Sequence, residues 1–238
     1  DFAKVNPVTG PVFVEGAEPG DALAIDILDF DTSDWGWTGI IPGFGLLAED
    51  FTEPWLNISR YDQDQVEFRP GILLPTRPFP GTIGVALSHT GHHSVVPPRS
   101  QGGNLDIRDL PRGTRLYLPV AVNGAHITKG ETHAAMTVRL RLHLVKAAGI
   151  TQPQYRVPAA AVRDEARGFY ATTGVGPDLM TAAKDAVRFM IDHLGREYQL
   201  DPALAYALCS VAVHLRISEI VDAPNWVVSA LLPDGVIG

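Results

Sequence analysis

The chain has 238 residues, of which 45% are hydrophobic and 19% charged, a usual balance for a globular protein with a sizeable buried core. Its formal net charge is −8 and no run of lysine or arginine occurs, which excludes a protein that follows a nucleic-acid backbone. A single cysteine excludes an internal disulfide, no apolar stretch is long enough to cross a bilayer and the first residues do not resemble a signal peptide, so a cytoplasmic location is expected.

Residues 1 to about 150 have the texture of an all-β region, with short apolar runs between turns rich in proline and glycine. After a turn at residues 18–21, Leu23, Ile25 and Ile27 occupy alternate positions, which predicts a strand with one buried face. Residues 116–120 form a second short strand. The clearest strand covers residues 137–145, where apolar side chains alternate with polar ones.

Beyond residue 150 the apolar spacing becomes helical. Residues 177–194 predict one helix, with Pro177 in its first turn and Gly195 as its stop. A second helix is predicted to begin at Asp201, an N-cap followed by proline, and to run through Leu215. This second helix is apolar on nearly every side, so we expect it to be buried.

These patterns predict an α+β fold that is mostly β. A sandwich or barrel-like β-rich domain is expected over residues 1–150, carrying the candidate active-site loops. An α+β segment with two helices, residues 151–238, is expected to pack on it.

Several familiar chemistries are absent from the sequence. There is no phosphate-binding glycine loop, no His-Glu-x-x-His, no cysteine pair for zinc and no Gly-x-Ser-x-Gly elbow. Cys209 lies in an apolar part of the second predicted helix, which is typical of a buried structural thiol rather than a nucleophile. His193 and His214 are predicted on helices without a partner one turn away, as for surface or core histidines.

Polar residues suited to chemistry gather between residues 89 and 133. In extended backbone Glu131 and His133 project to the same side, a pairing that suits a divalent ion, although the same residues fit a solvated turn. Asp106 follows Gly102-Gly103-Asn104, where backbone N–H groups can approach a ligand as an oxyanion hole requires, although this run also fits a tight hairpin turn. His92 and His93 are adjacent, so at most one serves a site, and His93 is favoured.

Nine short motifs, spread in order over nearly the whole chain, resemble the acetamidase/formamidase family. No one of them is decisive, but the ordered set is specific. The motifs span residues 6–12, 16–21, 41–45, 77–85, 102–106, 116–120, 130–134, 172–178 and 215–219, and the match continues through 224–229.

The resemblance implies a hydrolase that cleaves the C–N bond of small linear amides such as formamide and acetamide and releases ammonia. It also implies a divalent metal, zinc or calcium, which would polarise the carbonyl and activate water. We expect Asp106 and His133 as metal ligands and Glu131 as a ligand or general base. The backbone of Gly102, Gly103 and Asn104 is expected to stabilise the oxyanion.

Other residues of the resemblance are expected to shape the site. Arg99 is expected to orient its loop rather than act on substrate. Trp35, Trp37 and Phe44 could form the wall of a small pocket. They fit the hydrophobic core or an oligomer contact equally well. The chain is expected to act on a small-molecule amide as a homo-oligomer, without nucleic acid or membrane.

The sequence departs from the family pattern in two places. Family members usually begin several dozen residues earlier, and after the His-Ala of residues 133–134 they continue with an acid-rich run where this sequence passes from Ala135 to Met136. We expect a closed gap at that point rather than a true deletion. If the run is truly absent, a non-catalytic protein that binds small amides or urea gains weight, and a metal-free structural β-protein stays open as a third class.

Overall fold

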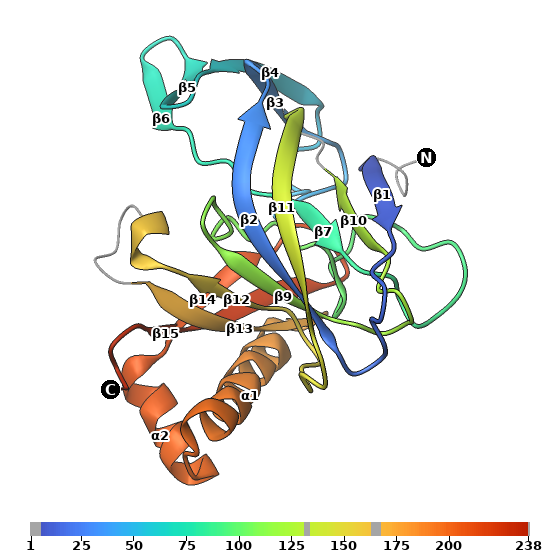
Figure 1. Ribbon diagram of the computed structural model, residues 1–238. Helices are drawn as coiled ribbons and strands as arrows, with labels where there is room; N and C mark the ends of the chain where they lie inside the picture. Colours follow the sequence, from blue (N-terminus) through green and yellow to red (C-terminus); the bar gives the residue numbers. More distant parts are fainter. Residues whose placement is uncertain (1–5, 131–133, 163–167, 238) are drawn as a thin grey trace.

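The computed structural model describes residues 6–130, 134–162 and 168–237 of the chain. Within these ranges the chain forms three open β-sheets, two α-helices and a short 3-10 helix, η2 (Ala159–Ala161) (Figure 1). The predicted mostly β α+β fold is confirmed, and it is the sandwich-like rather than the closed-barrel alternative. Neither helix in these ranges is both long and apolar enough to cross a membrane.

The main sheet is antiparallel and has the strand order β11-β2-β9-β12-β13-β15-β14. Because β9 pairs with β12, this sheet joins the part of the chain before residue 150 to the part after it. The two predicted regions therefore share one sheet. Its strands are β2 (Ala22–Thr32), β9 (Arg115–Pro119), β11 (Met136–Val145), β12 (Gln154–Val157), β13 (Phe169–Gly176), β14 (His214–Glu219) and β15 (Trp226–Pro233).

Two smaller sheets flank the main one. The inner sheet has the order β1-β10-β7-β8 and consists of β1 (Val8–Val12), β7 (Thr82–Gly84), β8 (Gly102–Asn104) and β10 (Ile127–Gly130). The distal sheet lies at the end of the molecule away from the helices (Figure 1). It consists of β3 (Trp35–Ile40), β4 (Trp55–Tyr61), β5 (Gln65–Arg69) and β6 (Ile72–Pro75).

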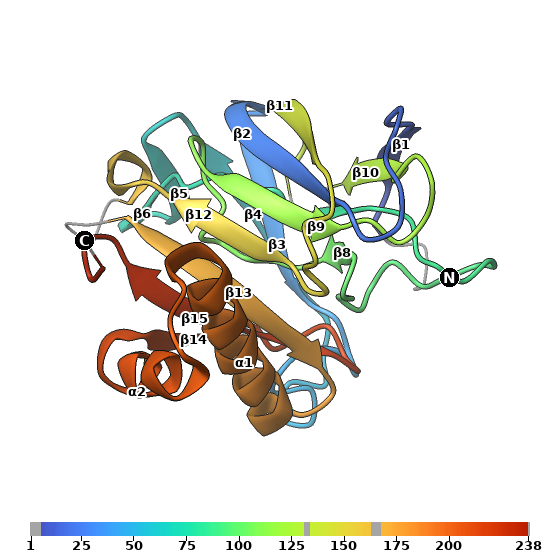
Figure 2. The same ribbon diagram turned by 60° about the horizontal axis from the view of Figure 1, so that its bottom comes forward.

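The core has two parts on opposite faces of the main sheet. The larger part joins Leu23, Ile25 and Ile27 of β2 to Ile83 of the inner sheet, and all four side chains are fully buried. The smaller part lies under the helices and includes Met190. Figure 2 shows α1 crossing the face of the main sheet at β13, so the layers are inner sheet, main sheet and helices.

Helix α1 (Leu179–Tyr198) begins where the sequence predicts and ends later. The Asp178 side chain accepts a hydrogen bond from the Thr181 amide, 2.7 Å, and so acts as the N-cap. The predicted stop at Gly195 is wrong, because the helix continues to Tyr198 and ends at Gln199 in the left-handed conformation.

Helix α2 (Pro202–Ala212) has the predicted Asp201 cap but ends three residues before Leu215. The predicted burial is wrong, since Leu204 and Val211 are 58% and 84% exposed. His214 opens β14 instead of lying on a helix.

The two core predictions for single side chains hold. Cys209 is a buried thiol whose pKa is raised by burial, in keeping with a structural role. His193 is a buried core histidine stacked on Tyr170, with ring centroids 3.8 Å apart.

Candidate active site

Asp106 lies just beyond β8, in a turn whose backbone geometry is imposed by its neighbours. Its φ of 44° is left-handed, a conformation that aspartate tolerates better than most residues, and its amide donates to the Gly81 carbonyl, 3.1 Å. Asp106 is half-buried. The turn therefore holds its carboxylate in place at the end of the inner sheet.

Two further acids come from the end of β14, more than a hundred residues later. Glu219 and Asp222 are both 4% exposed. One Glu219 oxygen accepts the backbone amides of Val221 and Asp222, and the second bond measures 2.6 Å. The other oxygen, Oε2, is buried and has no hydrogen-bond partner within the described chain. Asp222 shares a hydrogen bond with Asp106, which brings the acids into one group.

Burial changes the proton affinity of this group. It raises the pKa of Glu219 to about 7, against the effect of the two backbone hydrogen bonds and with a further rise from the charge of Asp106. It raises the pKa of Asp222 to about 8, with further rises from the charges of Asp106 and Glu219 and from the hydrogen bond to Asp106. Within the acid cluster, defined as Asp106, Glu219 and Asp222, the latter two residues therefore hold protons near neutral pH.

Asn104 ties the acid cluster to the inner sheet. Its Nδ2 donates to Asp222 Oδ2, 2.6 Å, and to the Val96 carbonyl, 3.0 Å. Its Oδ1 accepts from Thr82 Oγ1, 2.7 Å, and from Asn6 Nδ2, 3.0 Å. Both amide protons and both lone pairs of Asn104 are thus used within the protein. We interpret the side chain as positioning Asp222.

The Gly102–Gly103 segment is held by close backbone contact. A Cβ on Gly102 would lie 2.5 Å from the Ile83 carbonyl oxygen, so only glycine permits the approach of β8 to β7. The Gly102 amide already donates to the Arg99 carbonyl, 3.0 Å. An oxyanion role for this amide would require that bond to open, and the role stays a prediction.

A pocket of about 510 Å³ borders the inner sheet. Thr82, Gly102 and Gly103 form part of its wall, and Arg99 and His93 also line it. The Thr82 hydroxyl connects this wall through Asn104 to Asp222. Trp35, Trp37 and Phe44 are not among the residues that line the pocket.

Glu131 and His133 lie outside the described residues. The strand that leads to them is described, and its last residue, Gly130, is the cross-strand partner of Thr82 on one side and of Val8 on the other. The chain thus leaves the inner sheet at β10, with β7 between it and β8, the strand that carries Asn104. Their roles as metal ligand and base stay predictions.

The described residues do not by themselves form a metal site. Among them no group of three histidine, cysteine, aspartate or glutamate side chains could hold a metal ion. The unpartnered Glu219 oxygen is one suitable donor for calcium, but zinc prefers an imidazole or thiolate that the acid cluster lacks.

Sequence reasoning found Asp106 and missed Glu219 and Asp222. Both lie at the end of an alternating strand, in the run Glu219-Ile220-Val221-Asp222-Ala223-Pro224. Two acids within four residues before a proline, directly after an apolar strand, are the signal that was available.

Comparison with known proteins agrees with the sequence motifs. The model of the acetamidase/formamidase family matches residues 1–95, 90–137 and 134–237. The second junction falls where the sequence passes from Ala135 to Met136, the point of departure noted above.

Two named relatives each align with 56% of this chain at 29% identity. They are a formamidase of Methylophilus methylotrophus, over 188 residues and 46% of its length, and an acetamidase of Mycolicibacterium smegmatis, over 196 residues and 48% of its length. The matched part thus spans about half the length of either relative.

Solved structures extend the likeness to almost the whole chain. The Bacillus halodurans acetamidase has a TM-score of 0.85 and 31% identity over 98% of this chain and 80% of its own. The Yersinia enterocolitica acetamidase has a TM-score of 0.86 at 24% identity, covering 98% of this chain and 75% of its own, which shows the shared fold. With a family model matched from one end to the other and a fold shared with solved acetamidases, this chain belongs to the acetamidase/formamidase family.

Proposed function

We propose that the protein hydrolyses the C–N bond of small linear amides, with formamide and acetamide as the simplest substrates. The observation that carries the proposal is the acid cluster, which Asn104 joins to the pocket-lining Thr82, together with an unpartnered buried oxygen on Glu219. Membership of the family supports it, as do the relatives named formamidase and acetamidase.

The cluster supplies both halves of the proton transfer that amide hydrolysis needs. Asp106 is the most exposed of the three acids, so it is suited to take a proton from the attacking water. The pKa of Asp222 is raised to about 8, so this side chain can hold a proton and donate it to the leaving nitrogen. Water forms the new C–O bond, the C–N bond breaks, and the products are a carboxylate and ammonium.

A divalent metal, zinc or calcium, is part of the proposal through Glu131 and His133. When bound it would polarise the amide carbonyl and lower the pKa of the attacking water. We propose Asp106, the half-buried member of the cluster, as the third ligand. The proton transfers above do not depend on the metal. Metal analysis of the purified protein, and ammonia release before and after chelation, test this part.

The decisive experiment measures ammonia released from formamide and acetamide by the parent and by Asp106→Asn. The substitution keeps the shape and removes the base, so we expect turnover to fall by about 10²- to 10⁴-fold with unchanged circular dichroism. Asp50→Asn, at an exposed position, is the matched control and should retain activity. Retained activity in Asp106→Asn would remove this residue from the mechanism.

A non-catalytic amide- or urea-binding protein is the second candidate. Two features favour it: the hydrogen bonds that occupy the whole Asn104 amide, and the close backbone packing at Gly102. Both make the pocket rigid, and neither requires catalysis. Such a protein would retain labelled acetamide or urea in equilibrium dialysis and release no ammonia.

We further propose a homo-oligomer in the cytoplasm. The distal sheet has an inverted pattern, in which Asn57 and Ser59 of β4 are buried while Leu56 and Ile58 are 59% and 61% exposed. An exposed apolar strand face of this kind is typical of a subunit contact. Light scattering of the parent and of Ile58→Asp tests the assembly, and cell fractionation tests the location.

A further inference from the structure

The pocket bordered by Thr82, Gly102 and Gly103 is larger than formamide or acetamide requires. Its volume of about 510 Å³ lies in the range that holds molecules of drug size. Val8, Val85 and Val95 provide an apolar part of its wall. The described lining therefore offers room for a substrate with a chain beyond the amide group.

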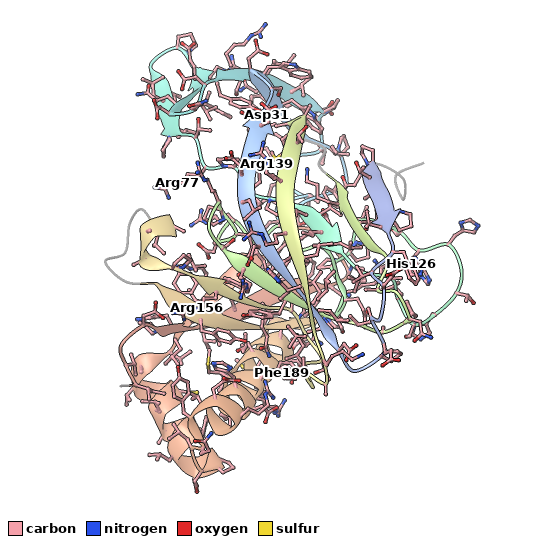
Figure 3. All side chains as sticks on the ribbon, in the orientation of Figure 1. Asp31, Arg77, His126, Arg139, Arg156 and Phe189 are labelled. Atoms are coloured by element: carbon pink, nitrogen blue, oxygen red, sulfur yellow. The ribbon has the colours of Figure 1, made fainter. Side chains whose placement is uncertain are left out.

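The polar part of the described lining is basic. Arg99, His93 and His126 all border the pocket, and none of the described lining residues is an aspartate or glutamate. Figure 3 shows His126 on the side of the molecule that carries β1 and β10. A pocket whose described lining contains an arginine and no acid favours an anionic ligand.

Arg99 has donors to spare. Its Nη1 donates to the Pro97 carbonyl, 3.0 Å, and no carboxylate of the described residues contributes to its electrostatics. A guanidinium carries five N–H donors in a fork that matches a carboxylate. Burial lowers the pKa of Arg99, the mark of a cation that lacks a compensating anion. The contact to Pro97 fits the predicted loop-orienting role and leaves the other donors for a ligand.

The loop that carries Arg99 accepts hydrogen bonds from two asparagines that lie near members of the acid cluster in the sequence. The Val96 carbonyl accepts from Asn104, which also holds Asp222, and the Pro98 carbonyl accepts from Asn225 Nδ2, 2.9 Å. Asn225 follows Asp222 by three residues. Arg99 and the acid cluster are thus connected through the hydrogen bonds of two asparagines.

We propose that this pocket binds the carboxylate of the substrate at Arg99, so that the preferred substrates are monoamides of short dicarboxylic acids. The proposal rests on the proposed amide hydrolysis and names its substrate class. The acid cluster would repel the substrate carboxylate if that group approached it directly. With its carboxylate bound at Arg99, the substrate would instead turn its neutral amide toward Asp106. Hydrolysis with water then yields the dicarboxylate and ammonium.

The experiment compares succinamate with butyramide, which has a methyl group in place of the carboxylate. The kcat/KM for succinamate should exceed that for butyramide by about 10- to 100-fold, the worth of a charge-assisted contact. Arg99→Gln should abolish the preference and Arg99→Lys should restore part of it. Arg60→Gln, on the distal sheet, is the control and should leave the ratio unchanged. Binding of succinate, measured by calorimetry, should weaken in Arg99→Gln alone.

The outcomes separate this proposal from the proposed function. Equal rates on the two amides, with a ratio that Arg99→Gln does not change, would overturn the carboxylate subsite and leave amide hydrolysis standing. Succinate binding that depends on Arg99, with no ammonia from any amide, would support the subsite and overturn the hydrolase. Succinate binding that is equal in the parent and Arg99→Gln would also overturn the subsite.

Discussion

Replacing Glu219 by glutamine should stabilise the folded protein at alkaline pH. The glutamine oxygen can accept the same backbone amides of Val221 and Asp222. Its Nε2 takes the place of the unpartnered Oε2 and carries no charge. The substitution therefore keeps the shape of the β14 end and removes a charge that burial disfavours.

The size of the effect follows from the pKa of Glu219, raised by burial from 4.5 to about 7. The folded state binds the proton more tightly than the unfolded chain, so the free energy of unfolding falls as pH rises from 4.5 to about 7. By pH 8 the loss reaches about 3 kcal/mol, and at pH 5 it is still below about 1 kcal/mol. The stability difference between Glu219→Gln and the parent should thus be about 2.5 kcal/mol more favourable at pH 8 than at pH 5.

Denaturant unfolding at the two pH values, in the presence of a chelator, measures this double difference. Comparing the two pH values cancels any constant packing effect of the substitution. Glu67→Gln, at an exposed position on β5, is the matched control and should show no difference. A double difference near zero, or one of opposite sign, would refute the reasoning that Glu219 is buried and ionised at a cost. Added zinc or calcium should restore parent stability at pH 8 if the acids take part in a metal site.

Two further predictions concern the packing of α1. Burial lowers the pKa of His193 from 6.5 to about 4, so the parent should lose about 3 kcal/mol of stability as pH falls from 6.5 to 4. His193→Phe, which retains the stack on Tyr170, should lack this loss in unfolding titrations. Gly174→Ala would place a Cβ 2.0 Å from the Ala182 carbonyl oxygen and should cost about 3 kcal/mol or more, seen as a lower Tm. Gly176→Ala on the same strand has open space and should change the Tm little.

Strands with one polar and one apolar face were predictable, because polar and apolar residues alternate along their sequence. In β11, Val138, Leu140 and Leu142 are half-buried and the residues between them are exposed, as the alternation requires. The same alternation identified β2, although Ala22 and Ala24 are buried too, since the sheet is covered on both sides there. Local periodicity therefore fixed the strands but not the number of layers.

The burial of α2 could not be predicted from its composition. Apolar residues surround the helix, yet only Ala205 and Cys209 among them are buried, because the helix packs mainly on α1 and contacts the main sheet little. What covers Leu204 and Val211 is decided by contacts beyond the helix itself. Likewise α1 passes Gly195, since tertiary packing of Leu194 outweighs the cost of about 1 kcal/mol for a glycine in a helix.

Local sequence singled out only one of the three acids of the candidate site, for a related reason. Asp106 follows two glycines, so local sequence marks it, whereas Glu219 and Asp222 become significant only when β14 brings them to Asp106. That meeting depends on the main sheet, which pairs β9 with β12 and so carries the end of the chain back to the inner sheet. The Asn104 side chain shows this meeting directly, because its amide donates a hydrogen bond to Asp222, 118 positions later in the sequence. A substitution that loosens β9 from β12 should therefore affect the acid cluster without touching any of its members.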